Sequence, residues 1–169
     1  MPHRPDKIIS GGQTGADIGG LVGAERVNIK TGGYAPKGFK TEKGPQTGIL
    51  KKRFGLIEHN SANYQPRTLE NIKAACATLI FSTNAESKGT RLTIQFCNKE
   101  NKPHLLMNPS SRECENEIID VINRVKPRIL NIAGNRETVS PGISSRVACI
   151  IEHVMRMTPI SEADTMSDC

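Results

Sequence analysis

Tryptophan is absent from this chain of 169 residues, and aromatic residues make up only 4% of it. So few aromatic rings leave little surface on which nucleic-acid bases could stack. The five cysteines are widely separated, odd in number and without a Cys-x-x-Cys spacing. This pattern argues against a disulfide framework and against a zinc site. We therefore predict no metal site, and we expect most of the cysteines to be small core residues.

Long apolar runs are also missing from the sequence. No stretch approaches the roughly 20 residues that span a membrane, and the first residues, MPHRPDK, lack the apolar segment of a signal peptide. We expect a soluble, cytoplasmic protein without a membrane partner. The length suits one domain with a single core. We predict that residues 1–157 form this ligand-binding domain and that the polar tail, 158–169, is disordered.

Short apolar runs alternate with helical patterns along the chain. Strands are predicted at 7–10, 56–59, 77–82, 104–107 and 128–133, with helices from residue 15, over 67–76, over 118–125 and from residue 141. Residues 92–96 suit a strand or a helix by pattern, and a helix if Thr90 caps it. This order predicts the α/β class, as a single Rossmann-like three-layer domain with a mainly parallel sheet. Residues 31–68, rich in glycine and proline, are predicted to be mostly loop.

The first turn, KIISGGQTGAD, joins a strand to a helix through three glycines. In a parallel sheet, ligands bind where the carboxyl ends of the strands meet. Gly11, Gly12 and Gly15 would let backbone N–H groups approach an anion beside the positive end of the helix dipole. Gln13 and Thr14 could add hydrogen bonds from their side chains. A tight turn without any ligand is the alternative.

Two further turns are predicted to meet the first at the same edge, at 82–90 and 131–137. Lys88, Gly89 and Thr90 resemble a second anion-binding turn. Arg136 could clamp a phosphate, or could form a surface ion pair with Glu137.

The remaining candidate groups are carboxylates, because no nucleophile can be identified and the four histidines share no metal-ligand spacing. Asp17 lies in the first turn of the first predicted helix. It could complement the helix dipole, accept a hydrogen bond from a ligand, or hold a water. If the protein is an enzyme, Asp17 or Glu137 is the candidate general base.

Basic residues are concentrated between Lys30 and Arg53, where seven lysines and arginines face one acid, Glu42. Such a stretch could attract a small anionic ligand or nucleic acid, or could be a solvated loop. Only Tyr34 and Phe39 within it could stack on bases. A small anionic ligand is therefore favoured over a nucleic acid.

Five segments in this order resemble the family of putative molybdenum carriers: KIISGGQTGAD, GGYAPKGFKTEKGP, YQPRTLENIKAACATLIFS, KGTRLT and LNIAGNRETVSPGI. That family is related to the LOG/lysine-decarboxylase-like nucleotide-binding proteins. The resemblance covers about residues 7–155. It implies a Rossmann-like fold, a homo-oligomer, and a phosphate-bearing pterin- or nucleotide-like ligand, such as molybdenum cofactor (molybdopterin) or a nucleotide. By motif position it implies a site made of Gly11, Gly12, Thr14, Gly15, Asp17, Lys37, Gly38, Gly89, Thr90, Gly134 and Arg136.

The chain departs from the family pattern at three places. Ile18 stands where the family has arginine, Lys88 replaces a glycine, and Ala74-Ala75-Cys76 replaces acidic residues. The PGG-x-GT-x-x-E pattern of the phosphoribohydrolase relatives is absent, so no catalytic residue is carried over from them. A cofactor carrier or binding protein is the function that the resemblance implies. The alternative is a hydrolase or transferase that acts on a nucleotide-like substrate.

Overall fold

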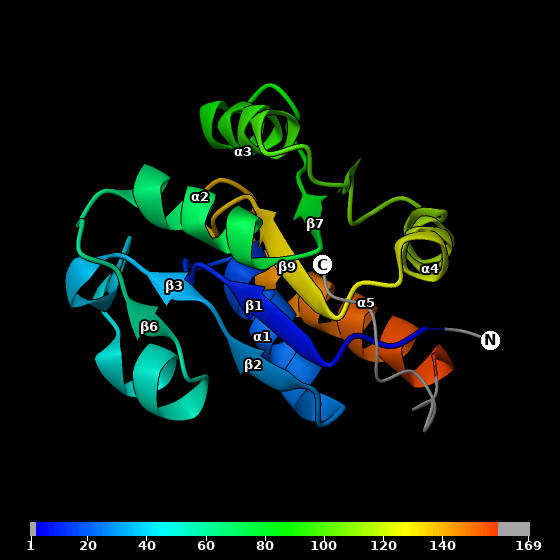
Figure 1. Ribbon diagram of the computed structural model, residues 1–169, viewed down its shortest axis with the longest axis horizontal. Helices are drawn as coiled ribbons and strands as arrows, with labels where there is room; N and C mark the ends of the chain where they lie inside the picture. Colours follow the sequence, from blue (N-terminus) through cyan, green and yellow to red (C-terminus); the bar gives the residue numbers. More distant parts are fainter. Residues whose placement is uncertain (1–2, 159–169) are drawn as a thin grey trace.

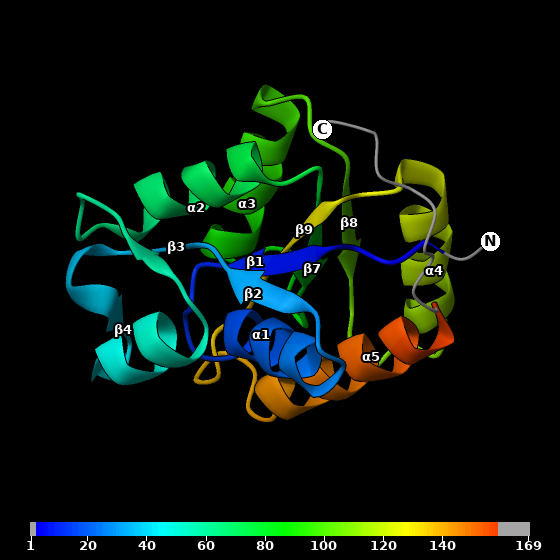
Figure 2. The same ribbon diagram turned by 60° about the horizontal axis from the view of Figure 1, so that its bottom comes forward.

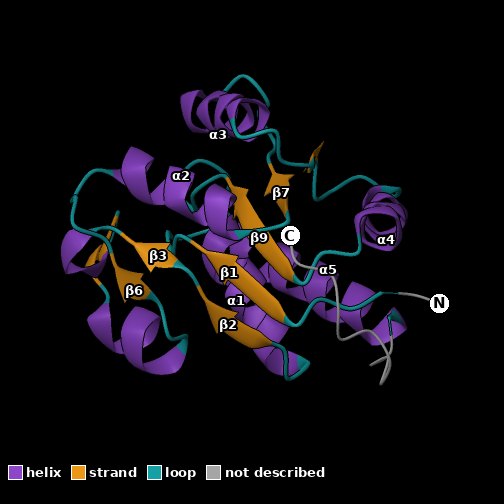
Figure 3. Cartoon of the chain, viewed as in Figure 1, coloured by secondary structure: helices purple, strands orange, loops and turns teal. Residues whose placement is uncertain are grey.

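The computed structural model describes residues 3–158 and contains one central parallel sheet. Its five strands lie in the order β2-β1-β9-β7-β8, and every neighbouring pair is parallel (Figures 1 and 3). The strands are β1 (Lys7–Ser10), β2 (Lys30–Gly32), β7 (Ala77–Phe81), β8 (His104–Met107) and β9 (Ile129–Gly134). The predicted α/β class with a mainly parallel sheet is confirmed.

Helices cover both faces of this sheet, which gives the predicted three layers. Figure 2 shows α2 and α3 on one face and α1 and α5 on the other. The main core joins the sheet to α1, α4 and α5 through side chains such as Ile118, Ile132 and Ile151, each 0% exposed. The helices are α1 (Ala16–Arg26), α2 (Tyr64–Ala74), α3 (Lys88–Lys99), α4 (Cys114–Val125) and α5 (Ile143–Met157).

The ambiguous segment around Leu92 is helical and belongs to α3. Ser87 caps this helix, because its hydroxyl accepts a hydrogen bond from the Thr90 amide. Thr90, Thr93 and Cys97 are its buried residues and recur with helical spacing. The cap and this buried face explain why the helix prevails over the apparent alternation.

Three glycines within α1 allow unusually close packing, which offsets their low helix propensity. A Cβ atom at Gly20 would lie 2.7 Å from Cβ of Ile132 in β9, and one at Gly19 would lie 2.5 Å from the Ser144 carbonyl oxygen in α5. The helix therefore contacts the sheet and α5 with its backbone. This contact depends on the glycines.

Replacing Gly19 by alanine should lower the free energy of unfolding by about 1–2 kcal/mol, because overpacking costs more than the helix gains. Urea denaturation followed by circular dichroism measures this loss. Gly89→Ala is the matched control, since the space around Gly89 is open and no loss is expected there. Equal stability of the two variants would contradict the close-packing explanation.

Residues 31–68 fold into short elements rather than the long loop that the sequence suggests. These elements are β3 (Tyr34–Ala35), η1 (Lys37–Phe39), β4 (Lys40–Thr41), β5 (Gly44–Pro45), η2 (Gly48–Arg53) and β6 (Ile57–Glu58). The predicted strand at 56–59 is β6, which pairs in parallel with β3. A second apolar cluster fixes the segment against α1 through Leu21, Phe39, Leu50 and Phe54. Phe39 is only 5% exposed and offers no stacking surface.

The predictions on cysteines, the tail and membranes have mixed outcomes. Cys97 and Cys114 are buried core thiols as expected, whereas Cys149 is exposed. Of the predicted tail only Thr158 is described, and it is buried, with its hydroxyl 3.3 Å from the carbonyl oxygens of Val154 and Met155. Residues 159–169 lie outside the described part. None of the helices within residues 3–158 has both the length and the apolar character that crossing a bilayer requires.

Candidate functional site

The three predicted turns do meet at the carboxyl edge of the sheet, and they are bonded to one another. The Ala16 amide donates to the Asn135 carbonyl at 3.0 Å, which joins the turn after β1 to the turn after β9. The Ser82 hydroxyl donates to Oδ1 of Asn135 at 3.0 Å and adds the turn after β7. Asn135 is 5% exposed and is bonded to both other turns, which makes it the central residue of this edge. Sequence reasoning placed it in a turn but assigned it no role.

The glycines of the first turn accommodate parts of the protein itself. A Cβ at Gly11 would lie 1.7 Å from Nη1 of Arg67, and a Cβ at Gly12 would lie 2.8 Å from the side chain of Leu50. A Cβ at Gly15 would lie 2.3 Å from the carbonyl oxygen of Asn135. The glycines of this turn are therefore explained by close packing within the protein, because other parts of the chain fill the space that a ligand was expected to occupy.

Three backbone amides of the first turn are also paired internally. The Gly12 amide donates to Oγ of Ser10 at 3.3 Å, and the Gln13 amide donates to Oδ2 of Asp17 at 3.1 Å. The Thr14 amide donates to Oε1 of Gln13 at 3.0 Å. In this conformation the Asp17 carboxylate occupies the position expected for a ligand anion, which corrects the expectation of free amides there.

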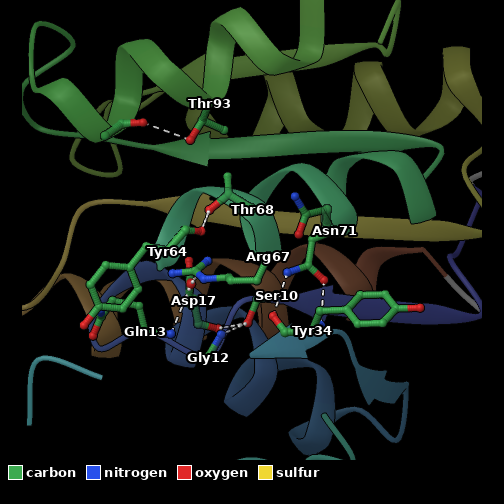
Figure 4. Close-up of polar contacts among 12 residues, drawn as sticks. Ser10, Gly12, Gln13, Asp17, Tyr34, Tyr64, Arg67, Thr68, Asn71 and Thr93 are labelled. Carbon is green, nitrogen blue, oxygen red and sulfur yellow. Dashed lines mark hydrogen bonds and ion pairs between the residues drawn. The ribbon is translucent and has the colours of Figure 1, made fainter. Parts of the chain in front are cut away.

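Asp17 forms a buried ion pair with Arg67 of α2, a residue that sequence reasoning missed (Figure 4). Oδ2 of Asp17 lies 3.4 Å from Nη1 of Arg67, and the two residues are 5% and 8% exposed. Burial raises the pKa of Asp17, opposed by the Arg67 charge and by hydrogen bonds from the Gln13 and Gly11 amides. Asp17 thus joins the first turn to α2, through the Gln13 amide and Arg67. The only sequence signal for this partner was the presence of a basic residue, Arg67, in the predicted helix 67–76.

A cavity of about 1000 Å³ opens at this edge, between α2, α3 and the turn after β9. Among the predicted site residues, Gly89, Thr90, Gly134 and Arg136 line it. The rest of the lining is Asn63, Tyr64, Gln65, Pro66, Leu69, Ser87, Lys88, Leu92, Phe96, Asn135, Thr138 and Val139.

The N-terminus of α3 forms the polar end of this cavity. The amides of Lys88 and Gly89 find no acceptor within residues 3–158, whereas the Thr90 amide is capped by Ser87. Nδ2 of Asn135 lies 3.3 Å from Oγ of Ser87, and the Thr90 hydroxyl donates to Oγ of Ser82 at 3.2 Å. This network links the first turn of α3 to the turns after β7 and β9. Two unpaired amides at a helix N-terminus can bind an anion.

Arg136 adds positive charge to the lining of the cavity. Its guanidinium carbon lies 4.8 Å from the centroid of the Tyr64 ring. The suggested ion pair between Arg136 and Glu137 does not form. Glu137 instead accepts hydrogen bonds from the Gly142 amide at 2.5 Å and the Ser144 amide at 3.1 Å, at the start of α5. Arg136 forms no ion pair with any described carboxylate and is free to contact a ligand.

Comparison with known proteins places the chain in a family. The model of the circularly permutated YpsA SLOG family matches residues 8–155, which is most of the chain. This protein belongs to that family. A crystal structure of a putative molybdenum carrier protein from Syntrophus aciditrophicus SB is similar, with 31% sequence identity and a TM-score of 0.82. The match covers 90% of this chain and 96% of the other. No curated protein matches this chain.

In this YpsA-like protein, the other predicted site residues lie away from the large cavity. Gly12, Thr14, Gly15 and Glu137 line a smaller cavity of about 410 Å³ beside α1 and η2. Lys37 and Gly38 line neither of these two cavities. Their amides donate to the Ser61 carbonyl and to Oε1 of Glu58.

Metal ligands do not cluster in this family member, as far as it is described. Within residues 3–158, no group of three or more His, Cys, Asp or Glu side chains could hold a metal ion.

Proposed function

We propose that the protein binds a small phosphorylated ligand with a planar ring, of the pterin or nucleotide type, in the large cavity. The observation that carries this proposal is the pair of unpaired amides, Lys88 and Gly89, at the cavity end of α3. A phosphate there would receive two backbone hydrogen bonds and the favourable field of the helix dipole. Arg136, which also lines the cavity, would contribute a charge-assisted hydrogen bond.

The walls of the cavity suit the planar ring of such a ligand. Leu69, Leu92, Phe96 and Val139 supply apolar surface, and Tyr64 adds an aromatic ring. Ligand pockets of this kind are mostly apolar, with a few polar groups that fix orientation. The name of the similar protein from Syntrophus supports a molybdenum-related ligand. Molybdenum cofactor, a phosphorylated pterin, has the required chemistry.

Carriage is preferred over catalysis because of where the acids lie. Neither Asp17 nor Glu137 lines the large cavity. Asp17 is bonded to Arg67 and the Gln13 amide, and Glu137 caps α5. A general base must reach the proton that it removes. The alternative hydrolase or transferase would need one of these carboxylates to leave its present partners.

Native mass spectrometry of the protein purified from its own organism tests the proposal first. We expect a retained mass that releases a phosphorylated, ring-bearing compound on denaturation. AMP, as a nucleotide probe, should bind in isothermal titration calorimetry. Absence of a retained compound together with absence of AMP binding would contradict the proposed function.

The matched variants Gly89→Asp and Gly89→Asn test the phosphate position. The space around Gly89 is open, so both side chains fit. Aspartate in the first turn favours the helix but repels a phosphate. We expect Gly89→Asp to weaken AMP binding at least about tenfold, the effect of one charged interaction, while Gly89→Asn changes it much less. Similar affinities for the two variants would argue against a phosphate at this helix end.

A further inference from the structure

Two buried donor atoms beneath the first turn have no partner among the described residues. They are Nε2 of Gln13 and Nε of Arg67. Gln13 is 5% exposed and Arg67 is 8% exposed, so bulk water does not satisfy these atoms. Buried polar groups without partners are rare and costly, and they indicate an acceptor that the protein itself does not supply. Figure 4 shows both side chains gathered beside Tyr64 and Asp17.

The orientation of the Gln13 amide is fixed by its surroundings. Oε1 accepts hydrogen bonds from the Thr14 amide at 3.0 Å and from the Glu42 amide at 2.9 Å. A flipped side chain would turn its NH₂ group toward two donors. Nε2 is therefore the free end of Gln13.

The guanidinium of Arg67 also has fewer hydrogen-bond acceptors than it could contact. It carries five N–H donors, yet the hydrogen bond found among the described residues is that from Nη1 to Asp17, at 3.4 Å. Nη1 lies directly over Gly11, where a Cβ would come within 1.7 Å. The absence of a side chain at Gly11 thus makes room for a guanidinium that is only partly satisfied.

Positive charge exceeds negative charge around these donors. Lys40, Arg67 and Arg136 each lie within 6 Å of the Tyr64 ring centroid, at 5.5, 5.6 and 4.8 Å. The two nearby carboxylates have partners already. Asp17 accepts from the Gln13 amide, and Glu42 accepts from the Thr14 and Thr138 hydroxyls. A further acceptor here would be favoured if it were an anion.

We propose that Gln13 Nε2, Arg67 and Arg136 form a second binding site, for a tetrahedral oxyanion, beneath Tyr64. Tyr64 lines the large cavity and contacts both arginines, so this site lies beside that cavity. The oxygens of the anion accept from the orphan donors, and its charge balances the excess of cations. The occupant is either a free oxyanion or a phosphoryl group of a larger ligand. This inference does not depend on the phosphate position at α3.

The variant Gln13→Glu tests the site sharply. It keeps an acceptor for the Thr14 and Glu42 amides, and it replaces the orphan donor by a negatively charged oxygen. Gln95→Glu is the control, because it makes the same substitution at an exposed residue of α3 that lines neither of the two cavities. Isothermal titration calorimetry with inorganic phosphate, molybdate and AMP, at constant ionic strength in chloride, measures the affinities. We expect Gln13→Glu to lose at least about tenfold in affinity, and Gln95→Glu to lose much less.

The three probes separate the possible occupants. Binding of inorganic phosphate or molybdate that Gln13→Glu weakens supports a free oxyanion, and an effect restricted to AMP supports a phosphoryl group. Should Gln13→Glu fail to fold, Arg67→Lys, which keeps a cation beside Asp17 but removes Nε, is expected to show the same loss. Equal effects of Gln13→Glu and Gln95→Glu, or no probe binding above chloride, would overturn the proposal and leave water as the occupant. Gly89→Asp should leave the affinity of this site for inorganic phosphate unchanged. A failure of this proposal can therefore be distinguished from a failure of the proposed function.

Discussion

Replacing Arg67 by methionine is expected to lower the free energy of unfolding by about 3–5 kcal/mol, the usual cost of breaking a buried ion pair. Methionine has a similar length and can cover Gly11, so the main loss is the charge beside the buried Asp17. Urea denaturation at pH 7 measures the change. The loss should be large because Asp17 also anchors the first turn through the Gln13 amide.

The control for this variant is Arg53→Met. Arg53 pairs with Glu25 at 2.7 Å, closer than Arg67 to Asp17, but both partners are largely exposed. Exposed pairs contribute about 0–1 kcal/mol. If Arg67→Met costs no more than Arg53→Met, the buried pair does not stabilise the fold in the way described.

The Arg67→Met variant should also change the dependence of stability on pH. Burial already raises the pKa of Asp17, and removing Arg67 removes the largest opposing influence. The folded variant then binds a proton that the unfolded chain releases near its ordinary value of 3.8. Its free energy of unfolding should therefore fall as pH rises from about 4 toward the folded-state pKa. Denaturation at pH 5 and pH 8 should show a greater loss at pH 8, and an equal loss would contradict this assignment.

Replacing Arg136 by glutamine is expected to weaken AMP binding by about tenfold to a hundredfold. A hydrogen bond to a charged group contributes about 1.5–3 kcal/mol, and Arg136 forms no ion pair with a described carboxylate that would compete for its charge. Glutamine keeps a polar side chain but removes the charge. Isothermal titration calorimetry with AMP checks the loss.

Lys99→Gln serves as the comparison for Arg136→Gln, since it removes one positive charge at the far end of α3, outside the cavity lining. Its effect should be small at 0.15 M salt, where screening acts over about 8 Å. Unchanged stability of Arg136→Gln in thermal denaturation would show that the loss concerns the ligand. Equal losses in the two variants would mean that only the overall charge matters.

Much of the fold could be predicted because parallel strands are buried on both faces and are read as short apolar runs. The runs at 7–10, 77–82 and 104–107 agree closely with β1, β7 and β8. The segment 31–68 could not be predicted in the same way. Its elements are two to six residues long, too short for a periodic pattern, and their apolar residues meet only in the folded chain.

The meeting of the three turns at one edge could be predicted, but the contacts between them could not. Parallel topology is enough to bring the turns after β1, β7 and β9 to one edge. A glycine that makes room for a ligand cannot be distinguished in the sequence from one that makes room for another side chain. Gly11 makes room for Arg67, which is 56 positions away. The pairing of Asp17 with Arg67, and of Asn135 with Ser82 and Thr83, is likewise long-range. These contacts decide which of the predicted amides remain free.

A titration of ¹⁵N-labelled protein with AMP, followed through the backbone amide resonances, tests the central claim most directly. We predict that the amide signals of Lys88 and Gly89 shift most, because these groups are unpaired at the N-terminus of α3. The amides of Gly12, Gln13 and Thr14, which are already bonded internally, should shift less. Dominant shifts in the first turn, with α3 unaffected, would contradict the account.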